Sequence, residues 1–190
     1  PFWGDQIGSY FMSINRGKKG ITLNLADDQG RDILLSLVKQ ADVVVENFIP
    51  GTMKRLGIDY PVLKKVNPGI IYAAISGFGQ TGPYASRPAL DVVIQGMGGL
   101  MSITGEPGRP PVRAAIPLSD IVAGMFTAIA ILAALRERSI SGQGQMIDIG
   151  MFDTQAMMLE HAYADFWTTG KAPGPLGSRH ATAAPFQAFE

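Results

Sequence analysis

The chain has 190 residues, of which 46% are hydrophobic, so it can bury a core as one domain or as part of a larger one. Basic and acidic residues number 16 each, which excludes both the basic excess typical of nucleic-acid binding and the acidic excess typical of disorder. The absence of cysteine excludes disulfides and thiolate metal sites and fits a reducing compartment, and we expect a cytoplasmic protein.

The first half of the chain alternates predicted strands with predicted helices. Alternating or continuous apolar residues predict strands over 21–25, 42–46 and 70–76. Between them, helical spacing of apolar residues and capping residues predict helices over 28–41, 52–56 and 60–66. This order predicts an α/β fold with a parallel sheet.

Two loops follow predicted strands directly. In open α/β sheets ligands bind at the carboxyl ends of the strands, which makes the loop Asn47–Gly51 a candidate binding segment. The glycine-rich loop Gly77–Tyr84 lets backbone approach a ligand, but it matches neither a Walker loop nor a dinucleotide fingerprint, and a plain connector explains it as well. The basic turn Asn15–Gly20 could meet a phosphate or be a solvated surface turn.

The second half contains the most hydrophobic predicted helix. We expect a helix over 89–102, a short strand over 112–116, a strand over 145–149, a helix over 151–167 and an aperiodic segment over 170–190. Between these, apolar residues at helical spacing predict a helix from Ser119 to Leu135 that is apolar nearly all round and therefore buried. Its apolar part, about 15 residues, is shorter than the roughly 20 residues of a bilayer span, so we expect no membrane span.

Asp120 stands at the start of this helix. Ser119 and Asp120 are both favoured N-cap residues, and backbone N–H donors and the helix dipole would keep such a carboxylate ionised. One interpretation is that Asp120 only caps the helix. The other is that an ionised, positioned aspartate attacks an activated acyl group and carries it covalently.

Several stretches together resemble the class III CoA transferases, the CaiB/BaiF or formyl-CoA transferase family. They occur in a characteristic order over essentially the whole chain: 15–25, 41–51, 76–83, 119–121, 142–145, 177–180 and 184–186. The resemblance implies an α/β, Rossmann-like CoA-binding region of an interlaced homodimer. Residues 1–150 would be part of that large domain, without its first strand and helix, and residues 151–190 a helix and connection toward a second domain. We therefore expect an internal piece of a larger protein.

The resemblance also implies a mechanism and a set of site residues. Asp120 matches the catalytic aspartate, which takes the acyl group from an acyl-CoA, becomes an aspartyl-CoA thioester and passes CoA to a carboxylic acid. No tightly bound cofactor is implied, because CoA is a substrate. Residues that match CoA-contacting positions are Leu23, Asn24, Leu25, Ala26, Asn47, Phe48, Ile49, Arg55, Leu90 and Asp91.

Two alternatives stay open. A 2-methylacyl-CoA racemase shares this fold and uses the aspartate opposite a histidine that should fall just before Asp91, but position 90 is Leu. Two opposed bases are needed for that reaction, so the missing histidine favours the transferase. The other alternative is a non-catalytic CoA-binding fragment.

Overall fold

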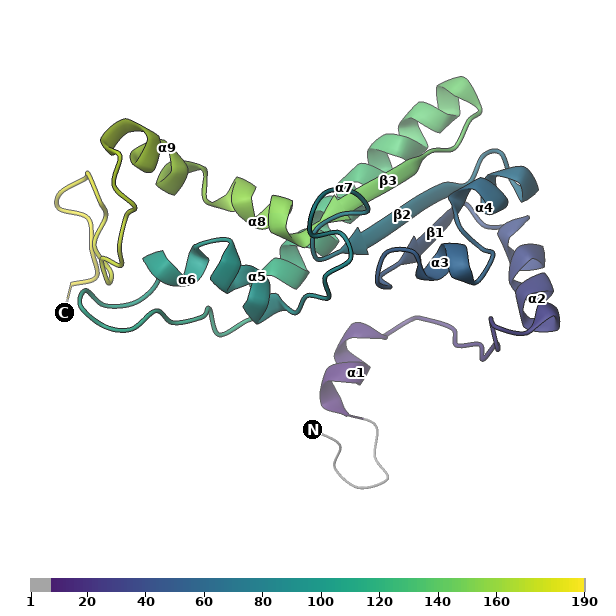
Figure 1. The fold of residues 1–190 in the computed structure, drawn as a ribbon, viewed down its shortest axis with the longest axis horizontal. Helices are drawn as coiled ribbons and strands as arrows, with labels where there is room; N and C mark the ends of the chain where they lie inside the picture. Colours follow the sequence, from purple (N-terminus) through teal and green to yellow (C-terminus); the bar gives the residue numbers. More distant parts are fainter. Residues whose placement is uncertain (1–7, 190) are drawn as a thin grey trace.

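The fold is a small parallel sheet with helices on both faces and an arm of helices at one end (Figure 1). The computed structural model describes residues 8–189, so the first seven residues of the predicted domain 1–150 lie outside them. The three described strands are β1 (Val43–Glu46), β2 (Ile71–Ser76) and β3 (Met146–Gly150), in the order β1-β2-β3 and all parallel. The predicted α/β class and these three strands are confirmed.

The helices α2 (Asp28–Val38), α3 (Thr52–Arg55) and α4 (Tyr60–Val66) cover one face of the sheet. Asp27 caps α2 by accepting a hydrogen bond from the Gln29 backbone N–H. Tyr72 and Ala74 of β2 point into this layer and form its core with fully buried Leu63. Because alternate residues of a strand face opposite ways, Ile71 and Ala73 face the other layer.

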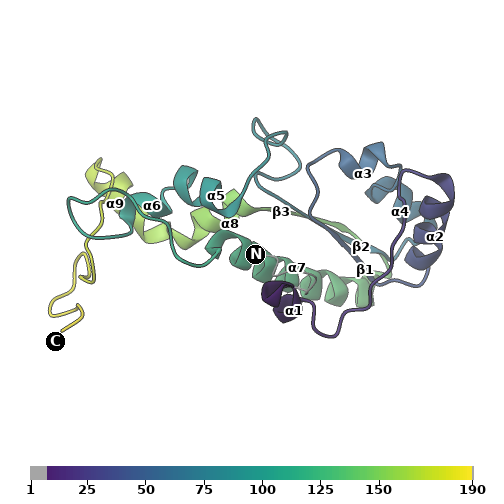
Figure 2. The ribbon, with the colours of Figure 1, turned by 90° about the horizontal axis from the view of Figure 1, so that it is seen from below.

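The long helix α7 (Leu118–Ser141) covers the opposite face (Figure 2). It begins after Pro117 and ends at Gly142, which adopts a left-handed conformation with φ of 71°. At this end the Arg138 guanidinium forms an ion pair with Asp42 at 2.8 Å and donates to the Gly69 carbonyl. These bonds fasten the C-terminal end of α7 to the amino edge of the sheet.

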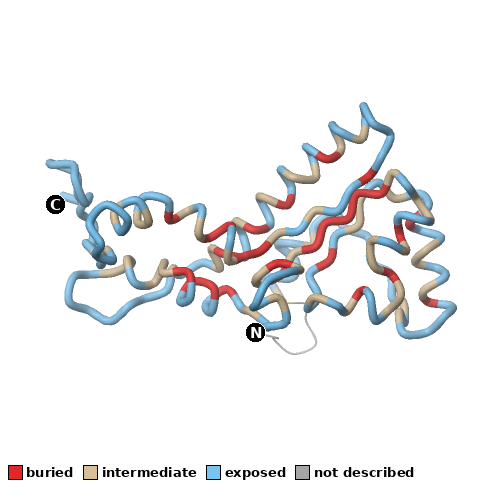
Figure 3. Tube along the Cα trace, turned by 45° about the horizontal axis from the view of Figure 1, so that its top comes forward, coloured by how far each residue is buried: buried red, intermediate tan, exposed pale blue. Residues whose placement is uncertain are grey.

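The predicted burial of the α7 helix is wrong for the described residues. Its buried side chains are small or polar, namely Ser119, Ala123, Thr127 and Ala134. These let α7 approach the sheet closely, while several of its large apolar residues are exposed; Figure 3 shows exposed positions recurring along this helix. The most exposed of them are Ile121, Met125, Ile129, Leu132 and Ile140.

The α7 helix is also longer than predicted, so its length does not exclude a membrane span. With 24 residues and high mean hydropathy, α7 is the one helix in residues 8–189 that could cross a bilayer by length and composition alone. A long apolar helix of a soluble core passes the same test, and α7 packs one face on β2, β3 and α8.

Two predicted strands are wrong. Residues 21–25 are not paired with any described strand, and Asn24 instead makes a turn before α2, since its carbonyl accepts a hydrogen bond from the Asp27 N–H. Residues 112–116 run over α5, where the Ala114 N–H donates to the side chain of Gln95 rather than to a strand. The sequence pattern predicted that both segments are extended, but an extended segment forms a strand only when another strand pairs with it.

Two predicted helices are each divided in two. The first is α5 (Asp91–Met97) and α6 (Leu100–Ile103), separated at Gly98 and Gly99. A Cβ atom on Gly98 would collide with the Gln155 carboxamide, so glycine allows close packing there. The second is α8 (Met151–Met158) and α9 (Glu160–Thr169), separated at buried Leu159. A further helix, α1 (Ser9–Ile14), precedes these elements, and residues 170–189 contain no helix or strand, as predicted.

Candidate active site

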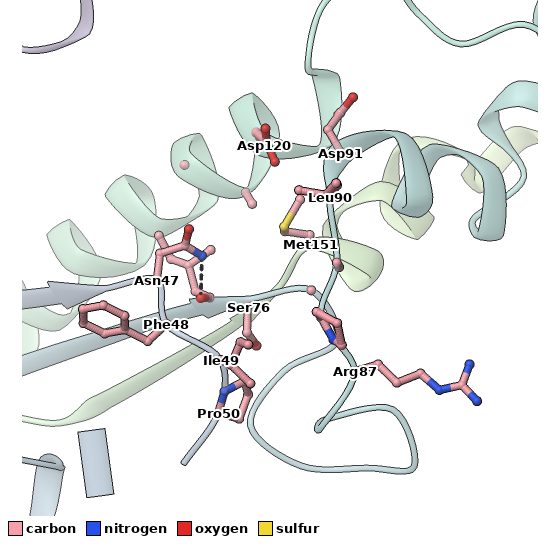
Figure 4. A pocket seen from close by; sticks show the side chains of 16 residues that line it. Asn47, Phe48, Ile49, Pro50, Ser76, Arg87, Leu90, Asp91, Asp120 and Met151 are labelled. Atoms are coloured by element: carbon pink, nitrogen blue, oxygen red, sulfur yellow. Dashed lines mark hydrogen bonds between the residues drawn. The ribbon is translucent and has the colours of Figure 1, made fainter. Parts of the chain in front are cut away.

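A cleft of about 600 Å³ opens at the carboxyl ends of β1 and β2, beside the starts of α5 and α7 (Figure 4). It therefore lies where ligands bind in open α/β sheets. Six of the predicted site residues line it: Asn47, Phe48, Ile49, Leu90, Asp91 and Asp120. They are distant in sequence, and the fold brings them together. The other lining residues are Pro50, Ile75, Ser76, Gly77, Arg87, Pro88, Ala89, Ala123, Gly124 and Met151.

The loop after β1 is held rigidly at the cleft. The Asn47 side-chain amide donates to the Ile75 carbonyl at 2.8 Å, and the Phe48 N–H donates to the Glu46 carboxylate at 2.7 Å. Buried Glu46 also accepts from the Tyr72 hydroxyl, and burial, followed by the charge of Glu46, raises the pKa of that phenol. These bonds preorganise the loop, which lowers the entropy cost of binding a ligand along it.

Asp120 is presented to the cleft without a capping role. It is the third residue of α7, after Leu118 and Ser119, and its carboxylate accepts no hydrogen bond from any described residue. The prediction that Asp120 caps the helix is therefore wrong. So is the prediction that its environment favours the ionised form, because burial, and then the negative charge of Asp91, raise the pKa of Asp120 above its ordinary value.

Asp91 supplies the cap that Asp120 does not. One of its carboxylate oxygens accepts from the Ser119 backbone N–H at 2.8 Å, and the other accepts from the Gln95 amide at 2.7 Å. Asp91 is nine-tenths buried and Gln95 fully buried. Asp91 thus lines the cleft, but both of its oxygens are already engaged by the protein.

The remaining predicted residues do not line this cleft. Arg55 is the exposed last residue of α3, the short helix that follows the Asn47–Pro50 loop. The segment Leu23–Ala26 lies in the turn before α2, where Leu25 packs against the core of the α2–α4 layer. The structure brings neither to the cleft lining, so any contact they make with a ligand lies outside it.

Ser76 is a cleft residue that the sequence analysis missed. Its hydroxyl is buried and has no hydrogen-bond partner within residues 8–189. A buried unpaired hydroxyl is costly, and one that lines a cleft is available to a ligand. Its place as the last residue of a strand before a glycine was the available sequence signal. Arg87, also missed, stacks on Tyr84 and points away from the cleft (Figure 4).

The glycine-rich loop is a fixed element beside the cleft. The Gln80 N–H donates to both oxygens of Asp148 on β3, and Phe78 packs against Phe152 of α8. Only its first residue, Gly77, lines the cleft. No group of three or more His, Asp or Glu side chains among the described residues is placed to hold a metal ion.

The comparisons with known proteins identify the family. A family model described as CoA-transferase family III matches residues 1–190. The chain belongs to CoA-transferase family III. It is 48% identical, over its whole length, to an acetyl-CoA:oxalate CoA-transferase of Acetobacter aceti, and covers 49% of that protein. It is 36% identical to the succinyl-CoA:glutarate CoA-transferase of Homo sapiens, covering 43% of it.

A solved structure of the family has the same fold. A CaiB/BaiF family protein from Brucella suis matches 94% of this chain and 47% of its own chain, with a TM-score of 0.89 and 44% identity. The chain thus spans about half the length of the family III relatives it matches. The resemblance drawn from the motifs is confirmed at the level of family and fold.

Proposed function

We propose that this chain forms the CoA-binding part of a CoA transferase, which moves CoA between an acyl-CoA thioester and a free carboxylic acid. The observation that carries the proposal is Asp120, a carboxylate that caps nothing and faces the cleft from the start of α7. Its family supports the same activity, because relatives in CoA-transferase family III are named for CoA transfer to oxalate and glutarate.

In the proposed mechanism the Asp120 carboxylate attacks the thioester carbonyl of the donor. The C–S bond breaks, leaving a mixed anhydride on Asp120 and a CoA thiolate, which attacks the Asp120 carbonyl and releases the donor acid. The acceptor carboxylate then attacks the aspartyl-CoA thioester, whose C–S bond breaks to leave a second mixed anhydride and the CoA thiolate. The thiolate attacks the acceptor carbonyl of this anhydride, which gives the new acyl-CoA and frees the Asp120 carboxylate. Each intermediate stays activated, so a cleft that excludes water preserves the free energy of the thioester.

The proposed substrate positions follow the cleft. Asn47, Phe48 and Ile49 would contact CoA through their anchored loop, with Leu90 near the acyl end. CoA carries phosphates that need cationic partners, so exposed Arg55 and the segment Leu23–Ala26 would contact its nucleotide part beyond the cleft. The Ser76 hydroxyl would donate to a carbonyl of the bound thioester arm.

We further propose that the active protein is an interlaced homodimer. The exposed apolar face of α7, formed by Ile121, Met125, Ile129 and Leu132, supports it, because contiguous exposed apolar surface marks interaction sites. Residues 1–150 would belong to the Rossmann-like CoA-binding domain, and 151–190 would lead toward a second domain. The lack of cysteine supports a reducing compartment, the cytoplasm or, in a eukaryote, the mitochondrial or peroxisomal matrix.

A racemase is the second candidate, and the cleft supports it less. It needs two opposed bases, whereas the ionisable residues lining the described cleft are Arg87, Asp91 and Asp120. The residue before Asp91 is Leu90, 70% exposed, which cannot move a proton.

The test uses the full-length protein with acetyl-CoA or succinyl-CoA as donor and oxalate or glutarate as acceptor. Asp120→Asn should lower CoA transfer by on the order of 10³-fold, since it removes the nucleophile. Glu137→Gln, which changes an exposed acid at the far end of α7, should leave transfer unchanged. Full activity in Asp120→Asn would refute the proposal, and α-proton exchange in deuterated water without CoA transfer would establish the racemase instead.

A further inference from the structure

Gln155 on α8 connects the two helices that border Asp120. Its side chain is fully buried. The side-chain carbonyl accepts from the Ser119 hydroxyl at 2.6 Å, and the side-chain amide donates to the Ile94 carbonyl of α5 at 2.8 Å. A single side chain from a third helix therefore joins α5 to the first turn of α7.

Ser119, the other end of this link, immediately precedes Asp120. It too is fully buried, and it is held twice: its hydroxyl by Gln155 and its backbone N–H by Asp91. Neither bond comes from α7 itself. The placement of the Asp120 backbone at the cleft is therefore set by side chains of α8 and α5.

The packing at Gly98 makes room for the Gln155 side chain. Its carboxamide lies where a Cβ of residue 98 would stand, so glycine at that position admits it. On the other side of the network, Gln95 binds both Asp91 and the Ala114 N–H. Buried polar networks with all members satisfied fix one geometry more strictly than apolar packing does.

We propose that Gln155 is a positioning residue for Asp120, acting through the Ser119 hydroxyl. The inference rests on the proposed function, in which Asp120 is the nucleophile. A nucleophile must stand within about 3–3.5 Å of the carbonyl it attacks, and a misplacement of roughly 1 Å can slow reaction on the order of 100-fold.

The test is a double-mutant cycle on the full-length protein. Gln155→Met keeps the size of the side chain and removes both hydrogen bonds, and Ser119→Ala removes the same link from its other end. The rate of covalent adduct formation on Asp120 is measured in single turnovers at saturating succinyl-CoA, and CoA affinity is measured separately by calorimetry. Thr154→Val is the matched control, since the buried Thr154 hydroxyl bonds only the Met151 carbonyl within α8.

Each single variant should slow adduct formation roughly 10- to 100-fold with CoA affinity changed less than about threefold. The double variant should be no slower than the slower single variant, because both changes break one link. The Thr154→Val rate should equal that of the wild type. Should Gln155→Met fail to fold, the milder Ser119→Ala decides by itself.

The experiment distinguishes a failure of the Gln155 positioning role from a failure of the proposed CoA-transferase function. If the wild type forms the Asp120 adduct and the variants form it equally fast, or if the two losses multiply, Gln155 does not position Asp120. If the wild type forms no adduct with any acyl-CoA it binds, the proposed function fails first and the positioning role falls with it.

Discussion

Asp91 accepts a hydrogen bond from the Ser119 backbone N–H at 2.8 Å, so a residue of α5 caps the helix that carries Asp120. Neither Ser119 nor Asp120 therefore caps α7, although both are residue types that favour the N-cap position. Ser119 turns its hydroxyl inward to Gln155, and Asp120 is left to the cleft. The cap also brings a negative charge beside Asp120, and this has consequences for the dependence of activity on pH.

The charge of Asp91 should be visible in the pH profile. Because burial and Asp91 raise the pKa of Asp120, the nucleophile is protonated as pH falls through that raised value, and transfer should be lost at a higher pH than for an ordinary aspartate. Asp91→Asn removes the charge and should move the acid limb of the profile of kcat/KM to lower pH. An acid limb that does not move would show that Asp91 does not influence Asp120.

The same shift predicts the sign of a stability change. A carboxyl whose pKa is higher in the folded than in the unfolded state binds more protons when folded, so its contribution to stability is lost as pH rises between the two values. Asp120→Asn should therefore stabilise the protein at neutral pH, by less than about 1 kcal/mol, because Asp120 is exposed and its carboxyl is only partly desolvated at the cleft. The advantage should vanish at acid pH, as measured by urea unfolding at pH 7 and pH 3. A destabilised variant at pH 7 would contradict it.

Ser76→Ala should separate ligand binding from stability. The hydroxyl lacks a partner in the described part of the chain, so its removal should leave stability unchanged or raise it. If the hydroxyl binds the thioester arm, acyl-CoA affinity should fall roughly 2- to 10-fold, the worth of one hydrogen bond. Calorimetry on both proteins measures this, with Ser36→Ala as control because that exposed hydroxyl bonds within α2. Unchanged affinity would leave Ser76 without a binding role.

Arg55→Ala should weaken CoA binding although Arg55 lies outside the cleft lining. A charge-assisted bond to a phosphate contributes about 1.5–3 kcal/mol, so the dissociation constant should rise roughly 10- to 100-fold, and less at high salt. Lys65→Ala removes an exposed cation from α4 and should have no effect. Equal CoA affinity in the Arg55 variant and the wild type would refute the phosphate contact.

The exposed face of α7 should be covered in the full-length homodimer. Met125→Glu with Leu132→Glu places two charges on side chains that are 60% and 66% exposed in this chain. They should cost the single chain little and break the dimer, as seen by sedimentation. Leu37→Glu, on a half-exposed apolar residue of α2, is the control. A dimer that survives the double change would show that this face is not its interface.

The local patterns predicted most elements because a helix or strand that packs on a core repeats its apolar residues with a regular period. Continuous apolar runs predicted β1 and β2, alternation predicted β3, and Asp27 marked the start of α2. Residues 21–25 and 112–116 could not be assigned from pattern, since a strand exists only where a neighbour pairs with it. The helix α7 was predicted to be buried, but one of its apolar faces is exposed in this chain. Apolar residues show that a face can be buried, and they do not show whether the same chain or another one covers it.

The sequence was sufficient to predict the loop after β1 and Asp120 as parts of the site. It was not sufficient to predict the hydrogen bonds that join Asp91, Ser119 and Gln155. Asn47 and Asp120 stand at positions whose chemistry shows in sequence, after a strand and at a helix start. The roles of Asp91, Ser119 and Gln155 depend on contacts between residues 28 and 36 positions apart along the chain, which no periodicity reports. The same holds for Ser76, whose unpaired hydroxyl is a property of its surroundings.

The most direct measurement is the chemical trapping of Asp120 in the full-length protein. The protein is mixed with succinyl-CoA, quenched with hydroxylamine or borohydride, and the modified peptide is mapped by mass spectrometry. We expect a hydroxamate or a reduced side chain at Asp120 alone, formed only when the acyl-CoA is present. An unmodified Asp120 in a protein that binds and turns over the acyl-CoA would contradict it.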